Sequence, residues 1–85
     1  MDSKNCELDS ARHHLHRVIR IREVERLVGR KRSSIYALMS PSSRYFDPDF
    51  PQKIRLSNQP NGSVGWMLSE ILAWIELKAM QRTGN

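Results

Sequence analysis

The chain has 85 residues, 39% of them hydrophobic, and a formal net charge of +5 at pH 7. This length leaves room for one small domain, and the single cysteine, Cys6, excludes an internal disulfide. No apolar run approaches the ~18–20 residues that cross a bilayer, and the N-terminus lacks the apolar centre of a signal peptide. We therefore expect a cytoplasmic protein with no membrane partner.

The positive charge is concentrated in the middle of the chain. Residues 17–55 hold ten lysines and arginines against four acids, a balance of +6, whereas residues 1–16 balance to −1 and residues 56–85 to zero. The phosphate backbone of a nucleic acid is the commonest partner for such a concentration, because its binding releases condensed counterions. A basic surface that only keeps the protein in solution is the alternative.

Residues 1–16 are polar and carry no repeating apolar stripe, so we expect a mobile N-terminal arm. His13, His14 and His16 lie in this arm, and neutral imidazole is a common metal ligand. No fixed carboxylate or thiolate is nearby, and a mobile arm does not preorganise a site. The sequence therefore favours histidines without a metal-binding role over a metal site, and no cofactor is expected.

Two short helices separated by Gly29 are expected after the arm. Apolar residues recur at steps of three and four, first at Ile21, Val24, Leu27 and Val28, and then at Ile35, Leu38 and Met39. Glycine adopts a left-handed backbone without steric cost, and so it ends a helix sharply. This pattern predicts a helix-turn-helix, a motif whose second helix reads DNA.

The second helix carries most of the residues predicted to contact DNA. With Ile35 facing the core, steps of about 100° per residue turn Ser33 and Ala37 outward and leave Ser34 and Tyr36 on the flanks. Cations gather at its N-terminal end, where hydroxyl and guanidinium groups can bond bases or phosphates. The candidates are Arg30, Lys31, Arg32, Ser33, Ser34, Tyr36 and Ala37. The alternatives are that a serine caps the helix and that the tyrosine packs on the core.

Residues 40–52 form a connection with three prolines, which forbid a continuous helix or a central strand. Tyr45, Phe46 and Phe50 are too many aromatic residues for a solvated loop. We therefore expect part of the connection to fold back on the core, with Phe50 and Pro51 as the anchor.

A β-hairpin is expected over residues 53–67. Alternating apolar residues before and after a turn-rich segment, with Asn61-Gly62 as the reversal signal, make Ile54, Leu56, Val64 and Trp66 available to the core. Beside a helix-turn-helix, such a hairpin is a wing whose tip enters a minor groove or lies along phosphates. The candidate contacts are Arg55, on the polar face, and Asn58, Gln59, Asn61 and Ser63 at the tip. A purely structural hairpin is the alternative.

Ser69 is the expected N-cap of a final helix that runs to about residue 80. Trp66 and Trp74 are expected to close the core. The predicted fold class is therefore α+β, mainly α: a small winged helix-turn-helix over residues 17–80, composed of the two-helix unit, a β-hairpin wing and a C-terminal helix. Residues 81–85 are expected to fray.

These residues resemble the AlpA-like prophage regulators. The resemblance is carried by the order and spacing of short segments over residues 17–76. The segments are Arg20-Ile21, Glu23-Val24, Leu27, Gly29, Arg32-Ser33-Ser34-Ile35-Tyr36, Phe50-Pro51, Val64-Gly65-Trp66, Ser69-Glu70-Ile71 and Trp74-Ile75. The resemblance implies a winged helix-turn-helix related to excisionases and to the DNA-binding heads of the MerR group. It also implies a bacterial or phage-borne transcriptional activator, or a recombination directionality factor for an integrated element.

The resemblance assigns Arg32, Ser33, Ser34 and Tyr36 to the recognition helix and residues 58–63 to the wing. This chain departs from the family pattern in three places.

Lys31 stands where a capping serine is usual, and Ala37 stands where a basic residue is frequent. The connection of residues 40–52 is longer than the usual Gly-Glu-Phe-Pro link, so its position is not implied by the resemblance.

The leading hypothesis is a sequence-specific DNA-binding regulator, associated with the nucleoid and with double-stranded DNA as its partner. An integrase, or another copy of the chain alongside on DNA, would raise occupancy through effective concentration. The alternative is a protein-interaction adaptor or antirepressor that holds another regulator. We expect neither an enzyme nor a small-molecule substrate, because the sequence has no nucleophile elbow, phosphate-cradling glycine loop or metal-spaced pair of histidine and acid.

Overall fold

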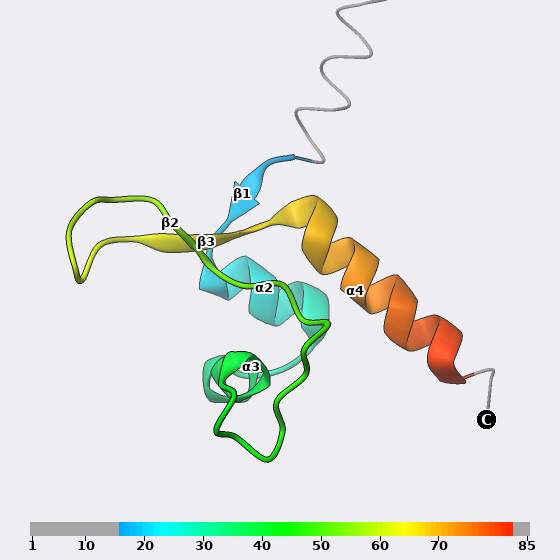
Figure 1. Cartoon of the computed structure of the whole chain (residues 1–85). Coiled ribbons are helices and arrows are strands. Elements are labelled where there is room, and N and C mark those ends of the chain that lie inside the picture. The colour runs from blue at the N-terminus through cyan, green and yellow to red at the C-terminus, as the bar shows by residue number, and fades with distance from the viewer. Residues whose placement is uncertain (1–15, 83–85) are drawn as a thin grey trace, which may run out of the picture.

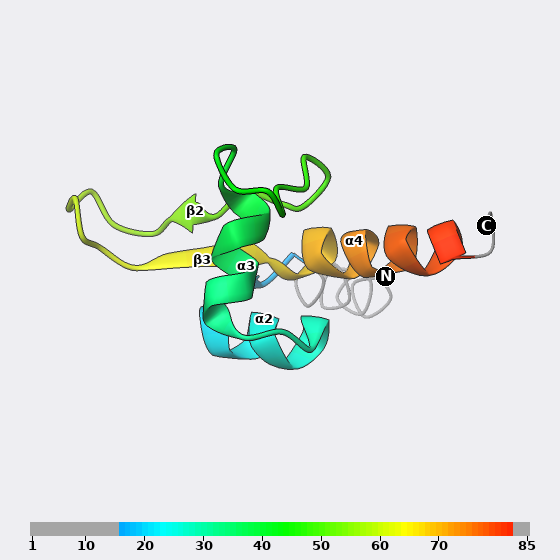
Figure 2. The ribbon, with the colours of Figure 1, turned by 90° about the horizontal axis from the view of Figure 1, so that it is seen from below.

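The computed structural model of the chain describes residues 16–82. Its elements are β1 (Val18–Ile19), α2 (Ile21–Val28), α3 (Arg32–Met39), β2 (Ile54–Arg55), β3 (Val64–Met67) and α4 (Leu68–Gln81). The hairpin of β2 and β3 extends to one side of α2 and α3, and α4 extends to the other (Figures 1 and 2). The fold is α+β and mainly helical, as the sequence predicts. The expected arm, apart from residue 16, and the last three residues of the tail lie outside the described residues.

The turn between α2 and α3 forms as predicted. Gly29 has φ 78° and ψ 27°, the left-handed conformation, and its N–H donates to the carbonyl oxygen of Glu25 at 2.8 Å. Val24 is fully buried, whereas Leu27 is 38% exposed. Leu27 is not part of the core, although it shares the apolar face of α2, and it lines a hollow between α2 and α4.

Neither α3 nor α4 begins with a side-chain cap. Lys31 is the N-cap residue of α3, and no side chain bonds to the first turn there, so Ser33 and Ser34 do not cap it. The expected cap of α4 at Ser69 is also wrong, since the N-cap residue is Met67, two residues earlier. β3 runs directly into α4, and the N–H of Leu68 donates to the carbonyl oxygen of Arg17 at 2.8 Å. Strand pairing, and not a serine hydroxyl, fixes where this helix begins.

The three strands form one antiparallel sheet in the order β1-β3-β2. β1 was not expected, because two residues are too few for a strand pattern. Ile19 pairs with Trp66, which brings β1 very close to the backbone of β3. A β-carbon at Gly65 would clash with Cγ1 of Val18 and come within 2.9 Å of the carbonyl oxygen of Ile19. Glycine at position 65 therefore permits this close approach.

The register of the hairpin differs from the expected one. Ile54 pairs with Gly65, and Arg55 pairs with Val64. Residues opposite each other project to the same face of a sheet, so Arg55 shares its face with Val64 and Trp66. Ile54 and Leu56 project from the other face, and Leu56 is 44% exposed. The expectation that the apolar residues of both strands share one core face is therefore wrong. The expectation that Arg55 lies on a separate, polar face is also wrong, because Arg55 and Trp66 project from the same face.

The chain reverses at the hairpin tip one residue before the expected position. The N–H of Gly62 donates to the carbonyl oxygen of Gln59 at 3.0 Å, which places Pro60 and Asn61 at the centre of the turn. Proline at the second position and glycine at the fourth suit a common type of β-turn that needs no left-handed residue. Accordingly, no residue of this turn has a positive φ; among the described residues, Gly29 alone does.

The hydrophobic core draws on every element except β2. Its buried residues are Ile19, Val24, Ile35, Leu38, Met39, Phe50, Trp66, Leu68, Ile71 and Trp74. Trp66 is fully buried, and its indole N–H donates to the sulfur of Met39 at 3.4 Å. The core role predicted for both tryptophans is confirmed.

The connection between α3 and β2 is anchored at Phe50, as predicted. Phe50 is 1% exposed, and its ring meets that of Trp74 edge-on, with the ring centres 5.0 Å apart. Tyr45 and Phe46, by contrast, are 61% and 37% exposed. Phe50 therefore confirms that part of the connection folds back on the core, whereas Tyr45 and Phe46 lie at the surface.

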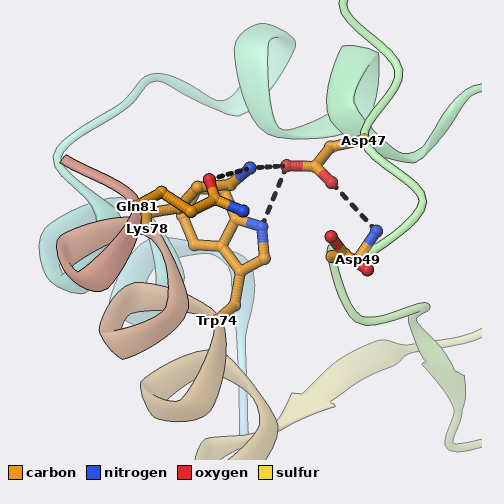
Figure 3. A network of polar contacts seen from close by, with 5 residues as sticks. All are labelled: Asp47, Asp49, Trp74, Lys78 and Gln81. Carbon is orange, nitrogen blue, oxygen red and sulfur yellow. Dashed lines mark hydrogen bonds and ion pairs between the residues drawn. The ribbon is translucent and has the colours of Figure 1, made fainter. Parts of the chain in front are cut away.

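Asp47 is a second anchor of the same connection (Figure 3). Its Oδ2 atom lies 2.7 Å from Nζ of Lys78 and accepts a bond of 3.2 Å from the indole N–H of Trp74. Its Oδ1 atom accepts from the N–H of Asp49 at 2.9 Å. Burial by itself would raise the pKa of Asp47, but the bonds from Lys78, Asp49 and Trp74 outweigh it and hold that pKa below its usual value.

Candidate nucleic-acid interface

α3 presents its small residues away from the core. Ile35, Leu38 and Met39 are buried, Ser33 is exposed, and Ala37 is half-buried. The outward direction predicted for Ser33 and Ala37 from the helical period is therefore confirmed. A helix with small residues on its outer face can approach a groove floor closely.

Tyr36 lies on one flank of α3 and holds two cations over its ring. The ring is half-buried and meets Trp66 edge-on at 6.1 Å between centres. The guanidinium carbon of Arg32 lies 5.6 Å from the centre of the Tyr36 ring, and Nζ of Lys53 lies 5.3 Å from it. Tyr36 therefore has the packing role that the sequence left open, and it also gathers cations from α3 and from the start of the wing.

A groove of about 340 Å³ runs between this flank of α3 and the wing tip. It is lined by Arg20, Ile21, Arg32, Tyr36, Asn61, Gly62, Ser63 and Val64. Four of the residues predicted to contact DNA meet here, two from α3 and two from the wing. Arg20, the residue before α2, also lines the groove.

The remaining wing candidates lie beyond this groove. Arg55 donates from its guanidinium to the carbonyl oxygen of Gln59 at 3.1 Å, so part of its donor set holds the tip in shape. The N–H of Gln59 in turn donates to Oγ of Ser57 at 3.1 Å. Arg55 and Asn58 line a separate hollow along the outer part of the hairpin, together with the residues between them.

The opposite flank of α3 has its own hollow, of about 350 Å³. Its lining residues are Arg30, Ser33, Ser34, Ala37 and Tyr45. Lys31, the N-cap residue, is exposed at the same end of the helix as Arg30. Tyr45 is the one lining residue that sequence reasoning missed, because its place beside α3 depends on how the long connection folds back.

The cations around α3 are not paired with acids. Within residues 16–82 the ion pairs are Arg17 with Glu23, at 2.9 Å, and Lys78 with Asp47. Neither pair involves a cation of α3 or of the turn before it. The positive charge of this surface is therefore available to an anionic partner.

The described part of the chain contains neither a cluster suited to a metal ion nor a helix able to span a membrane. Across residues 16–82, no group of three or more His, Cys, Asp or Glu side chains could hold a metal ion. His13, His14 and Cys6 lie outside those residues. None of the helices described has the length and apolar character that crossing a membrane requires.

Two helices joined by a glycine turn, an outward-facing cationic second helix and an adjoining β-hairpin define a winged helix-turn-helix protein. The sequence profile of the family described as prophage CP4-57 regulatory protein (AlpA) matches residues 17–79. The chain is also similar to the DNA-binding transcriptional activator AlpA of Escherichia coli (strain K12), with 36% identity over 59 residues, covering 69% of this chain and 80% of that protein. This chain belongs to the AlpA family of prophage regulatory proteins, as the resemblance implied. No solved structure is significantly similar to it.

Proposed function

We propose that this protein binds double-stranded DNA through α3 and the wing, and so regulates transcription or directs recombination for a prophage or another integrated element. Membership of the AlpA family supports the regulatory role, and the name of the Escherichia coli relative supports DNA as the partner. On this proposal the protein works in the cytoplasm, on the nucleoid, and it is not an enzyme.

The observation that carries the proposal is the grouping of cations around an outward face of small residues. Arg20 and Arg32 line the groove between α3 and the wing, and Lys53 shares the ring of Tyr36 with Arg32. Contacts from such cations to phosphates supply affinity and fix orientation. Base contacts from Arg32, Ser33 and Ser34 would then supply sequence preference.

The replacement Arg32→Ala tests this reading surface. We expect it to weaken binding to the selected site by about 1–3 kcal/mol and to relax the preference at one base position, because a bidentate guanidinium contact is lost. The measurement is binding to a sequence selected from a random library and to variants of it. Arg82→Ala, which removes the same charge just after α4, is the matched control. Unchanged affinity and footprint for Arg32→Ala would remove Arg32 from the surface.

A small reading helix has few groups for base contacts, so one copy of the chain should bind weakly. Copies side by side on repeated sites, or an integrase on a neighbouring site, would raise occupancy by effective concentration. Footprints separate the two regulatory roles: protection of a promoter indicates transcriptional control, and protection of the attachment site of the element indicates control of excision.

A protein-interaction adaptor is the second candidate, and the exposed apolar residues favour it. Leu27, Leu56 and Met80 are 38%, 44% and 70% exposed. A salt titration of duplex binding separates the candidates. Steep loss of affinity with salt supports DNA binding, and no measurable binding in low salt supports the adaptor.

A further inference from the structure

Tyr45, an exposed aromatic residue of the long connection, lies beside the flank of α3 to which the proposed mode of DNA binding assigns no phosphate contact. Arg32 and Tyr36 lie on the flank that faces the wing, and Ser34 lies on the other. Tyr45 borders the hollow on that second flank together with Ser34 and Arg30. The connection therefore reaches the same exposed side of the molecule as α3 (Figure 2).

The backbone around Tyr45 is held in place although its side chain is exposed. The N–H of Tyr45 donates to Oγ of Ser43 at 3.0 Å, and the N–H of Phe46 donates to the carbonyl oxygen of Ser43 at 3.1 Å. Two residues after Tyr45, the N–H of Asp47 donates to the carbonyl oxygen of Leu38 at 2.9 Å, which ties the connection to the end of α3. The position of Tyr45 relative to α3 is thus fixed by the fold.

Arg44 stacks on this tyrosine. Its guanidinium carbon lies 5.4 Å from the centre of the Tyr45 ring, and both side chains are exposed. The Tyr45 ring buries little area here, so packing gives no reason for an aromatic residue. A tyrosine hydroxyl and a stacked guanidinium are both donors that bind phosphate oxygens.

We propose that Arg44 and Tyr45 contact the phosphate backbone on the side of the major groove that the wing does not reach. This inference rests on the proposed binding of duplex DNA by α3. A helix in the major groove, which is about 12 Å wide, has a phosphate backbone on each side. The flank with Arg32 and Lys53 serves one backbone, and Arg30, Arg44 and Tyr45 serve the other. The long connection then extends the DNA-binding surface by a contact that a short link between helix and strand would not supply.

The test uses the full chain and a duplex of random sequence, because phosphate contacts do not depend on the bases. Affinity is measured over a range of salt concentrations for the wild type, Arg44→Gln, Tyr45→Ala and the matched control Arg82→Gln. We expect Arg44→Gln to reduce the slope of log affinity against log salt by about 0.9, the value for one lost phosphate contact. Tyr45→Ala should weaken binding several-fold, and Arg82→Gln should leave the slope unchanged.

The outcomes separate this inference from the proposed function. If Arg44→Gln changes the slope no more than Arg82→Gln does, or if Tyr45→Ala binds as the wild type, the contact is refuted while DNA binding by α3 stands. If the wild type shows no salt-dependent binding, both proposals fail. Arg44 and Tyr45 are exposed, so thermal unfolding monitored by circular dichroism should be unchanged in these variants, which excludes misfolding as the cause.

Discussion

The two turn-rich segments that follow α3, the connection of residues 40–52 and the hairpin tip of residues 56–63, are held in different ways. The connection is fixed by side chains that reach another element: Phe50 packs against Trp74, and Asp47 bonds to both Trp74 and Lys78. The tip is fixed by bonds within the hairpin itself, from Arg55 to the carbonyl oxygen of Gln59 and from the backbone of residues 56–63.

We therefore expect the connection to contribute more to the stability of the fold than the tip does. Removing an anchor of the connection disturbs the core, whereas changing the tip disturbs only a turn that is exposed to solvent.

The largest effect is expected for Phe50→Ala. Because the ring is fully packed against Trp74, we expect the free energy of unfolding to fall by about 3–5 kcal/mol. Urea unfolding followed by tryptophan fluorescence measures it. Tyr45→Ala, an aromatic replacement in the same connection, is the control and should change that free energy by no more than about 0.5 kcal/mol. Equal losses in the two variants would contradict the contrast between buried and exposed parts of the connection.

A smaller, pH-dependent effect is expected for Asp47→Asn. The folded pKa of Asp47 is below its unfolded value, so the carboxylate contributes stability above the unfolded pKa and loses it as the pH falls through the folded pKa. We expect the wild type to exceed the variant by about 1 kcal/mol at neutral pH, a modest figure because Lys78 is partly exposed.

The measurement for Asp47 is the unfolding free energy of both proteins as the pH is lowered. The difference between them should stay constant down to about pH 4 and shrink below it. Taking the difference removes the contribution of the other carboxylates. A difference that grows as the pH falls would show that the carboxylate does not stabilise the folded connection.

The smallest effect on stability is expected for the double variant Asn58→Ala, Asn61→Ala at the tip. Both residues are exposed, so the free energy of unfolding should change by no more than about 0.5 kcal/mol. Duplex binding should nevertheless weaken several-fold if the tip contacts DNA. Ser69→Ala, on α4 outside the proposed interface, is the control for binding. Unchanged binding by the double variant would remove Asn58 and Asn61 from the proposed interface.

Much of the helical part could be predicted because its signals are local. The period of Ile35, Leu38 and Met39 fixed the inward face of α3, and the need for a left-handed residue at Gly29 fixed the turn. The prediction for Ser69 failed because β3 continues directly into α4, so that a strand pair, and not a capping hydroxyl, determines where the helix begins.

The residues predicted to contact DNA also divide into those placed by a local pattern and those placed by tertiary contacts. Ser33 and Ala37 were oriented correctly from the helical period alone. Arg55 was expected on the polar face of the hairpin, but the register places it on the same face as Trp66. The place of Tyr45 beside α3 was not predicted. The groove that joins Arg32 and Tyr36 to Asn61 and Ser63 brings together residues from two distant segments, and no local pattern encodes that approach.

The helix-turn-helix, the outward face of its second helix and the family could all be predicted from local sequence, because helical period, glycine conformation and motif spacing act within a few residues. The hairpin register, strand β1 and the position of the long connection follow instead from tertiary packing. These depend on contacts between segments far apart in the chain. A shift of one residue in pairing moves every side chain of a strand to the other face, and alternation within each strand is the same in both registers.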